Sequence, residues 1–166
     1  MSLLPEWAPN LHPLVTHFPI VLLITAAAVD LANIIFGRPA WEAGMAAYLY
    51  TAGAASAVGA YLTGRDAATM VFVPGMAHGL VDDHWRWALL TTCYFAVFAT
   101  IRLSTHFARV RWSWISRILL VVLGLIGIAF LHQTAERGAQ LVYEHGVGVI
   151  GVVAPGPLGA NRLNER

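Results

Sequence analysis

Charged residues are scarce in this chain of 166 amino acids, and lysine is missing altogether. Only 11% of the residues are charged, against roughly 25% in an ordinary soluble domain. Hydrophobic residues make up 58% of the chain, and the mean hydropathy is +0.64. This composition excludes a soluble globular protein. The ten basic residues, all arginine, nearly balance nine acidic ones, so the chain has no basic excess of the kind that attracts nucleic acid.

Cysteine is represented by a single residue, Cys93, which lies inside an apolar stretch. One thiol cannot form an intrachain disulfide, and a cysteine-based zinc or iron–sulfur site needs several. Positive residues are also missing from the segment 1–10, which precedes the first apolar run. A cleaved signal peptide begins with a positive region, so we expect the first apolar run to be retained as a membrane helix.

Long apolar runs, in contrast, are abundant. A membrane helix needs about 20 mainly apolar residues, and the chain offers four such segments: 14–36, 43–63, 87–101 and 118–135. We count the short third segment as spanning because the flanking Arg86 and Arg102 can extend their charged ends toward the headgroups. The pattern predicts an all-α integral membrane protein, an up-and-down four-helix bundle over residues 1–137. A Gly/Pro-rich tail over 138–166 follows, at the interface or outside the membrane.

The arginines predict the orientation of this bundle. The loops after the first and third segments hold five of them: Arg38, Arg102, Arg109, Arg111 and Arg117. The positive-inside rule places these loops in the cytoplasm and both termini on the outer, periplasmic side. The second connection, 64–84, then also lies outside. It is long for a bundle loop and contains Pro74, so we expect it to cap the outer mouth of the bundle.

Histidine is the polar residue with the most informative distribution. Six of the seven fall at outer helix ends or in outer segments: His12, His17, His78, His84, His132 and His145. Only His106 falls at the inner end. A single histidine at a membrane interface is well explained by its tolerance of that environment. Polar groups near the membrane are costly and usually functional, so the cluster as a whole predicts a ligand site in the outer layer.

A haem suits this layer best. The first and third helices of an up-and-down bundle begin at the same face and lie diagonally across the core. His17 and His84 therefore approach from opposite sides, as the axial ligands of a six-coordinate iron do. His132 and His12 are further candidates, for this haem or a second one. A zinc site on one helical face fits less well because its ligands need a spacing of three or four, whereas zinc or copper shared among helices stays open.

Other features bear on such a site. Asp82 or Asp83 is near enough in sequence to accept a hydrogen bond from the His84 ring. Asp30, the carboxylate within the first apolar segment, is either a proton-relay group or the partner of an arginine. The run 53–60 consists almost entirely of small residues. Such a run allows close helix packing or leaves room for a flat macrocycle.

Two motifs point to a known family. The segments 11–20 (LHPLVTHFPI) and 141–149 (LVYEHGVGV), with the Thr-Gly pair 63–64, resemble the bacterial family catalogued as domain of unknown function 2231, small membrane proteins with four expected helices. The resemblance covers nearly the whole chain, and the paired histidines before Phe-Pro are its most specific part. Relatives of this type are found fused to c-type cytochrome domains, which implies electron transfer at a bacterial inner membrane. Carried over by position, the resemblance implicates His12 and His17 first, then His84, and last His132.

We therefore expect a small membrane subunit that binds one or two b-type haems through its outer histidines. It would relay electrons between a periplasmic partner, such as a larger redox complex or a cytochrome, and quinone or another respiratory component. The alternative is a haem-free anchor or assembly subunit of a larger complex. A transporter that uses Asp30 fits least, because no inverted repeat is evident. The chain shows no nucleophile–base pair that would indicate a standalone enzyme.

Overall fold

The computed structural model describes residues 10–37 and 40–149, and over these residues the secondary structure is helical. A short helix α1 (His12–Val15) leads directly into α2 (His17–Ile35). The remaining long helices are α3 (Ala40–Met70), α4 (His78–Phe107) and α5 (Trp114–Tyr143). A single 3-10 turn, η1 (Gly75–Ala77), precedes α4.

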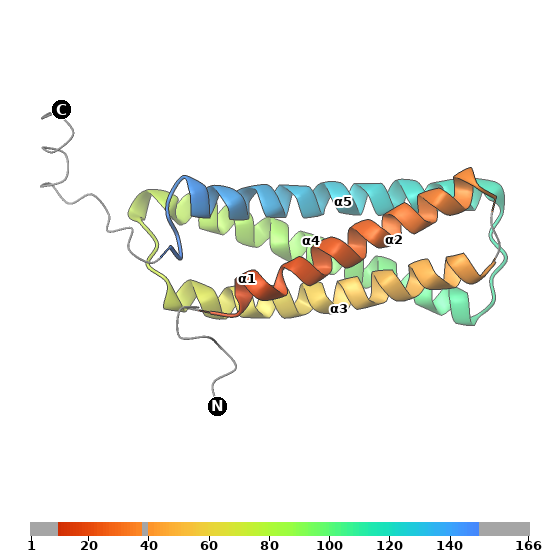
Figure 1. Cartoon of the computed structure of the whole chain (residues 1–166), viewed down its shortest axis with the longest axis horizontal. Helices are drawn as coiled ribbons and strands as arrows, with labels where there is room; N and C mark the ends of the chain where they lie inside the picture. Colours follow the sequence, from red (N-terminus) through yellow and green to blue (C-terminus); the bar gives the residue numbers. More distant parts are fainter. Residues whose placement is uncertain (1–9, 38–39, 150–166) are drawn as a thin grey trace, which may run out of the picture.

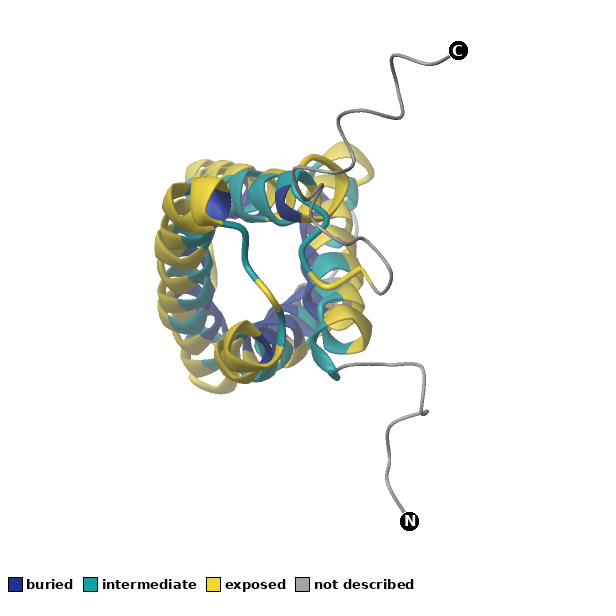
Figure 2. Cartoon of the chain, turned by 90° about the vertical axis from the view of Figure 1, so that its left-hand side faces the viewer, coloured by how far each residue is buried: buried dark blue, intermediate teal, exposed yellow. Residues whose placement is uncertain are grey.

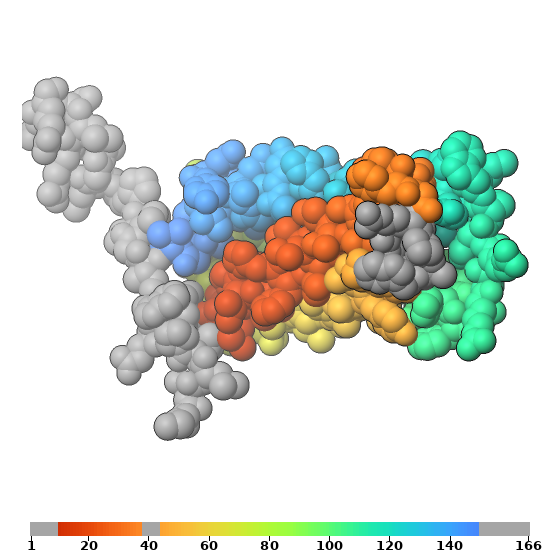
Figure 3. Space-filling model, turned by 45° about the vertical axis from the view of Figure 1, so that its right-hand side comes forward, coloured from red at the N-terminus to blue at the C-terminus, as the bar shows by residue number. Residues whose placement is uncertain are grey.

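The helices form an antiparallel bundle of four rods, with α1 and α2 together as the first (Figure 1). The α2 helix packs against α3 and α5, and α4 packs against the same two neighbours. Figure 3 shows α2 lying between α3 and α5 on one face of the molecule. The first rod and α4 therefore occupy diagonal corners, and the buried residues face a common interior in the end-on view (Figure 2). The predicted all-α four-helix bundle is confirmed.

The two ends of the bundle differ in composition. We call the end at which α3 stops, α4 starts and α5 stops the histidine end, because α1 with His12 also begins toward it (Figure 1). We call the opposite end, at which α4 stops and α5 starts, the arginine end, because Arg109 and Arg111 lie in its connection and Arg117 in the first turn of α5.

Three helical segments are long and apolar enough to cross a membrane: His12–Ile35, Gly75–Phe107 and Trp114–Tyr143. The α3 helix is long enough, with 31 residues, but its glycine, serine, threonine and tyrosine content lowers its hydropathy and it does not qualify by composition. It nevertheless runs alongside the other rods (Figure 1). Large hydrophobic side chains are exposed on the outer faces of the bundle, as a lipid-facing surface requires.

The connection predicted over 64–84 is mostly helical, so the prediction of a long loop is wrong. The α3 helix continues to Met70 and α4 begins at His78. The polar residues of this segment are compatible with a helix and simply lie beyond its apolar part. Pro74 marks the true turn, directly ahead of η1. As a result α4 has 30 residues and extends well beyond the predicted third span at both ends.

The predicted boundary between bundle and tail also moves. The α5 helix continues to Tyr143, past residue 137. Gly146, with a φ of 65°, follows the helix end, and the backbone N–H of Val147 donates to the carbonyl of Leu141. A positive φ is easily adopted by glycine, which explains its place in the segment that ends the helix. Residues 150–166 of the predicted tail lie outside the described residues.

Small residues and aromatic rings share the core. Tyr50, Phe95 and Phe98 contact one another at its centre. On α3, Gly53 allows α2 to approach so closely that a Cβ there would lie 2.6 Å from Cδ2 of Leu23. Gly53, the first residue of the small-residue run 53–60, therefore serves helix packing, one of the two roles predicted for that run.

Candidate functional site

His12 lies in the first turn of α1 and is held against α3. Its Nδ1 atom lies 3.0 Å from the carbonyl oxygen of Ala60 and 3.4 Å from Oγ1 of Thr63. Gly64 makes room for the ring, because a Cβ at that position would lie 2.9 Å from Cε1 of His12. A backbone acceptor and a glycine together fix where this imidazole lies.

His84 has a similar arrangement on α4, the rod diagonal to that of His12. Its Nδ1 atom lies 3.0 Å from the carbonyl oxygen of Thr134 on α5. A Cβ on Gly138 would lie 3.1 Å from Cε1 of His84, so here too a glycine accommodates the ring. The Thr134 hydroxyl is itself 2.9 Å from that of the buried Thr91, which ties α5 to α4 beside the site.

The acceptor that the sequence suggested for His84 is wrong. Asp82 and Asp83 are both exposed, and Asp83 lies 3.9 Å from Arg86 at the surface. One and two residues before His84 on a helix, their side chains project from other faces of α4. The Nδ1 partner is a backbone carbonyl of another helix, which no local pattern around His84 could reveal.

The two rings lie toward the same end of the bundle. They belong to diagonal rods, and their glycines lie at matching depths, roughly one and a half turns from the ends of α3 and α5. In the described part of the chain no group hydrogen-bonds to Nε2 of either ring. A ring that donates through Nδ1–H presents the Nε2 lone pair, which is the form that binds metals.

His17, which the sequence paired with His84, is exposed. His17 is five positions after His12 in the chain. At about 100° per residue, this spacing turns its side chain by about 140° around the helix axis from that of His12. Its Nδ1 atom lies 2.6 Å from the carbonyl oxygen of Pro13, to which the Thr16 hydroxyl also donates, at 2.9 Å. The structure therefore packs His12, and not His17, against α3.

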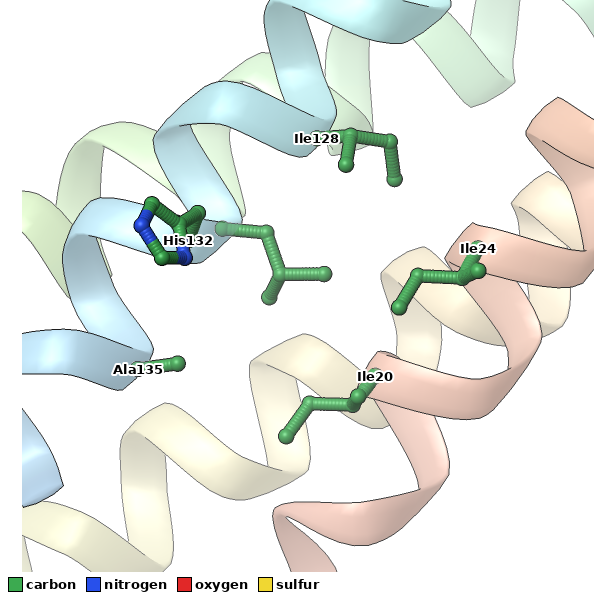
Figure 4. Close-up of a pocket in the computed structure, with 6 residues that line it drawn as sticks. Ile20, Ile24, Ile128, His132 and Ala135 are labelled. Atoms are coloured by element: carbon green, nitrogen blue, oxygen red, sulfur yellow. The ribbon is translucent and has the colours of Figure 1, made fainter.

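His132 also lies away from the interior. It faces an apolar groove of about 290 Å³ between α2 and α5 (Figure 4). Ile20 and Ile24 line the α2 side, and Ile128 and Ala135 flank His132 along α5. The His132 side chain is 73% exposed and lies 4.0 Å from Glu136. His132 is thus a surface residue of α5.

His106 lies at the arginine end of the bundle, the end opposite the one at which α1 and α4 begin. Its place in the sequence, after the third apolar segment, predicted this position. It lies near the end of α4, with Tyr48 edge-on at 5.4 Å between ring centroids. A Cβ on Gly44 would lie 2.8 Å from its Cε1 atom. Among the described residues, no group of three or more His, Cys, Asp or Glu side chains is arranged to hold a metal ion.

Two arginines lie next to the glycines that accommodate His12 and His84. Arg65 and Arg137 are the chain neighbours of the two glycines, and each guanidinium lies over an indole ring. The distance is 5.9 Å from Arg65 to Trp85 and 5.1 Å from Arg137 to Trp87. The sequence pattern did not single out either arginine, although each stands next to a glycine near the end of a helix.

The sequence model of one family, described as predicted membrane protein (DUF2231), matches residues 8–151. The chain belongs to this family. The match spans all four rods of the bundle. It includes His12 and His84 and the two glycines, Gly64 and Gly138, that accommodate their rings. No curated protein matches the chain, and no solved structure does.

The motifs by which the chain resembled the DUF2231 family now have structural roles. The Thr-Gly pair 63–64 receives the His12 ring. In the first motif, His12 faces α3 while the Thr16 hydroxyl and the His17 ring both bond to the Pro13 carbonyl. In the last motif, the glycines of HGVGV have positive φ and follow the end of α5.

Proposed function

We propose that this DUF2231 membrane protein binds a b-type haem between His12 and His84 and works as an electron-transfer subunit. The observation that supports the proposal is the matching placement of these two imidazoles. They lie on diagonal rods at one depth, each with Nδ1 at a backbone carbonyl and Nε2 without a partner in the described residues. The proposal keeps the predicted His84 and replaces the predicted His17 with His12.

The chemistry of the donor set fits haem iron. Two neutral imidazoles are sufficient axial ligands, because the porphyrin supplies the other four nitrogens. A zinc site takes three or four protein ligands, and the described residues present no such group. Arg65 and Arg137, next to Gly64 and Gly138 in the chain, supply two positive charges at the histidine end, which suits the two propionate groups of a haem.

When bound, the haem would supply one-electron redox chemistry, and the protein sets its potential through the axial ligands and their hydrogen bonds. In this chain the carbonyls of Ala60 and Thr134 orient the rings and increase the basicity of their Nε2 atoms. We expect the partner to be a periplasmic redox protein or a larger membrane complex, with quinone as a second candidate. Recovery of the protein only as an isolated monomer after mild extraction would contradict this expectation.

Optical spectra of the purified, dithionite-reduced protein test the proposal. The unmodified protein should show the sharp bands of a six-coordinate low-spin b haem. His12→Ala and His84→Ala should each abolish that spectrum or convert it to a high-spin form. The controls, His17→Ala and His132→Ala, replace exposed histidines and should leave it unchanged.

Other outcomes contradict the proposal in distinct ways. Loss of the low-spin spectrum in His17→Ala, with His12→Ala unaffected, would return the ligand role to His17. A protein without haem that copurifies with a larger complex would instead support the haem-free anchor or assembly subunit.

A further inference from the structure

A second polar cluster lies toward the arginine end, away from the histidine pair. Asp30 on α2 accepts a hydrogen bond from Arg102 on α4, with 2.6 Å between Oδ1 and Nη2, and both side chains are 7% exposed. The Arg102 guanidinium lies 5.8 Å from the centre of the Tyr50 ring on α3. Asn33, one turn after Asp30, is also buried. Three rods therefore contribute polar side chains to one buried region.

Four atoms of this cluster have no hydrogen-bond partner in the described part of the chain: Oδ2 of Asp30, Oδ1 of Asn33, Oη of Tyr50 and Nε of Arg102. Each atom is shielded from solvent. Leaving such an atom unpaired costs about 1–3 kcal/mol, and buried polar groups in proteins are almost always paired. Four orphans on neighbouring side chains therefore indicate partners other than the protein atoms that the structure describes.

The four atoms differ in what they require. The Asp30 and Asn33 oxygens need a donor, Nε of Arg102 needs an acceptor, and the Tyr50 hydroxyl takes either. A cation or an anion would satisfy only one kind. Water both donates and accepts, and buried waters typically make two to four hydrogen bonds to otherwise unsatisfied groups. The Tyr50 hydroxyl lies against Gly124 on α5, where a Cβ would be 2.5 Å from Oη.

We propose that Asp30, Asn33, Tyr50 and Arg102 enclose a bound-water site within the membrane-spanning part of the bundle. Asp30 and Arg102 lie roughly one and a half turns inside the ends of α2 and α4, or about 8 Å from the arginine end. Arg117 links the cluster to that end through a 3.1 Å hydrogen bond to the Asn33 carbonyl. The water keeps the Asp30–Arg102 pair hydrated and gives Oδ2 of Asp30 a partner for proton exchange with the arginine end. The site does not depend on the proposed haem.

X-ray radiolytic labelling of the full-length protein in nanodiscs, read out by mass spectrometry, tests this proposal. Hydroxyl radicals form from bound water where it lies, so a buried side chain is labelled only if water is next to it. Tyr50 and Phe95 are both 0% exposed, and their rings stack with 6.2 Å between centroids. After correction for intrinsic reactivity, Tyr50 should be labelled several-fold faster than Phe95. Equal protection of the two rings would overturn the proposal.

Variants locate the water. Asp30→Leu combined with Arg102→Leu removes both charges together, a change that buried ion pairs often tolerate, and should reduce Tyr50 labelling to the level of Phe95. The matched control, Asp83→Asn combined with Arg86→Gln, alters an exposed pair and should change nothing. Tyr50 labelling that persists in the double leucine variant would show that the radicals come from elsewhere.

Discussion

At the scale of the residue, the side of the helix on which each histidine lies decides which of them can act together. The sequence predicted a layer of histidines correctly, because their positions along the predicted helices were enough to assign depth. It did not distinguish His12 from His17. Their rotation about the helix axis is determined by the carbonyl of Ala60 and by Gly64, which are distant in sequence and belong to another rod.

The glycines that face the two rings give a residue-scale prediction. Gly138→Ala would place a Cβ 3.1 Å from Cε1 of His84, so the ring or α5 must shift. Overpacking of this kind typically costs about 1–3 kcal/mol. We expect haem affinity, measured by titration of the apoprotein, to fall about thirtyfold for a cost near the middle of that range.

Gly79→Ala is the matched control for this variant. It lies in the first turn of α4, and a Cβ there meets nothing within 4 Å. We expect its affinity for haem to equal that of the unmodified protein. If Gly138→Ala and Gly79→Ala bind haem equally well, the glycine does not shape the His84 site.

At the scale of the element, the apolar segments identified the helices but underestimated their length. Hydropathy reports only the part of a helix that lies in hydrocarbon, whereas α3 and α4 continue into polar sequence at the histidine end. The role of Asp30 was left between a proton relay and an arginine partner. Its partner, Arg102, is 72 residues away in sequence, and the packing of the bundle was needed to identify it.

The Asp30–Arg102 pair joins the diagonal rods, and its energetics give an element-scale prediction. Removing one partner leaves an uncompensated buried charge, so Arg102→Leu should lower the free energy of unfolding by about 3–5 kcal/mol. The double variant, Asp30→Leu with Arg102→Leu, should lie close to the unmodified protein. Denaturant titration in mixed micelles measures all three proteins.

The exposed pair of Asp83 and Arg86 is the control for this comparison. Asp83→Asn should change the free energy of unfolding by less than about 1 kcal/mol, because surface ion pairs contribute little. A loss in Arg102→Leu no larger than that in Asp83→Asn would show that the buried pair is not held as the structure indicates.

At the scale of the whole molecule, the bundle has chemically distinct ends. The histidine pair lies toward one end and the buried ion pair toward the other, so the two sites meet different sides of the membrane. From the positive-inside rule we expect the arginine end to be cytoplasmic. A reporter that is active only in the periplasm should be silent when fused after Arg109 and active when fused after Pro74. The reverse pattern would place the histidine pair on the cytoplasmic side.

The claim that two imidazoles ligate one iron is tested most directly by near-infrared magnetic circular dichroism of the oxidised protein. The position of the charge-transfer band in this spectrum depends on the identity of the two axial ligands of a low-spin haem. We predict the charge-transfer band of a bis-imidazole haem in the unmodified protein. This band should be lost in both His12→Ala and His84→Ala. A band from another ligand pair, or one that survives both substitutions, would contradict it.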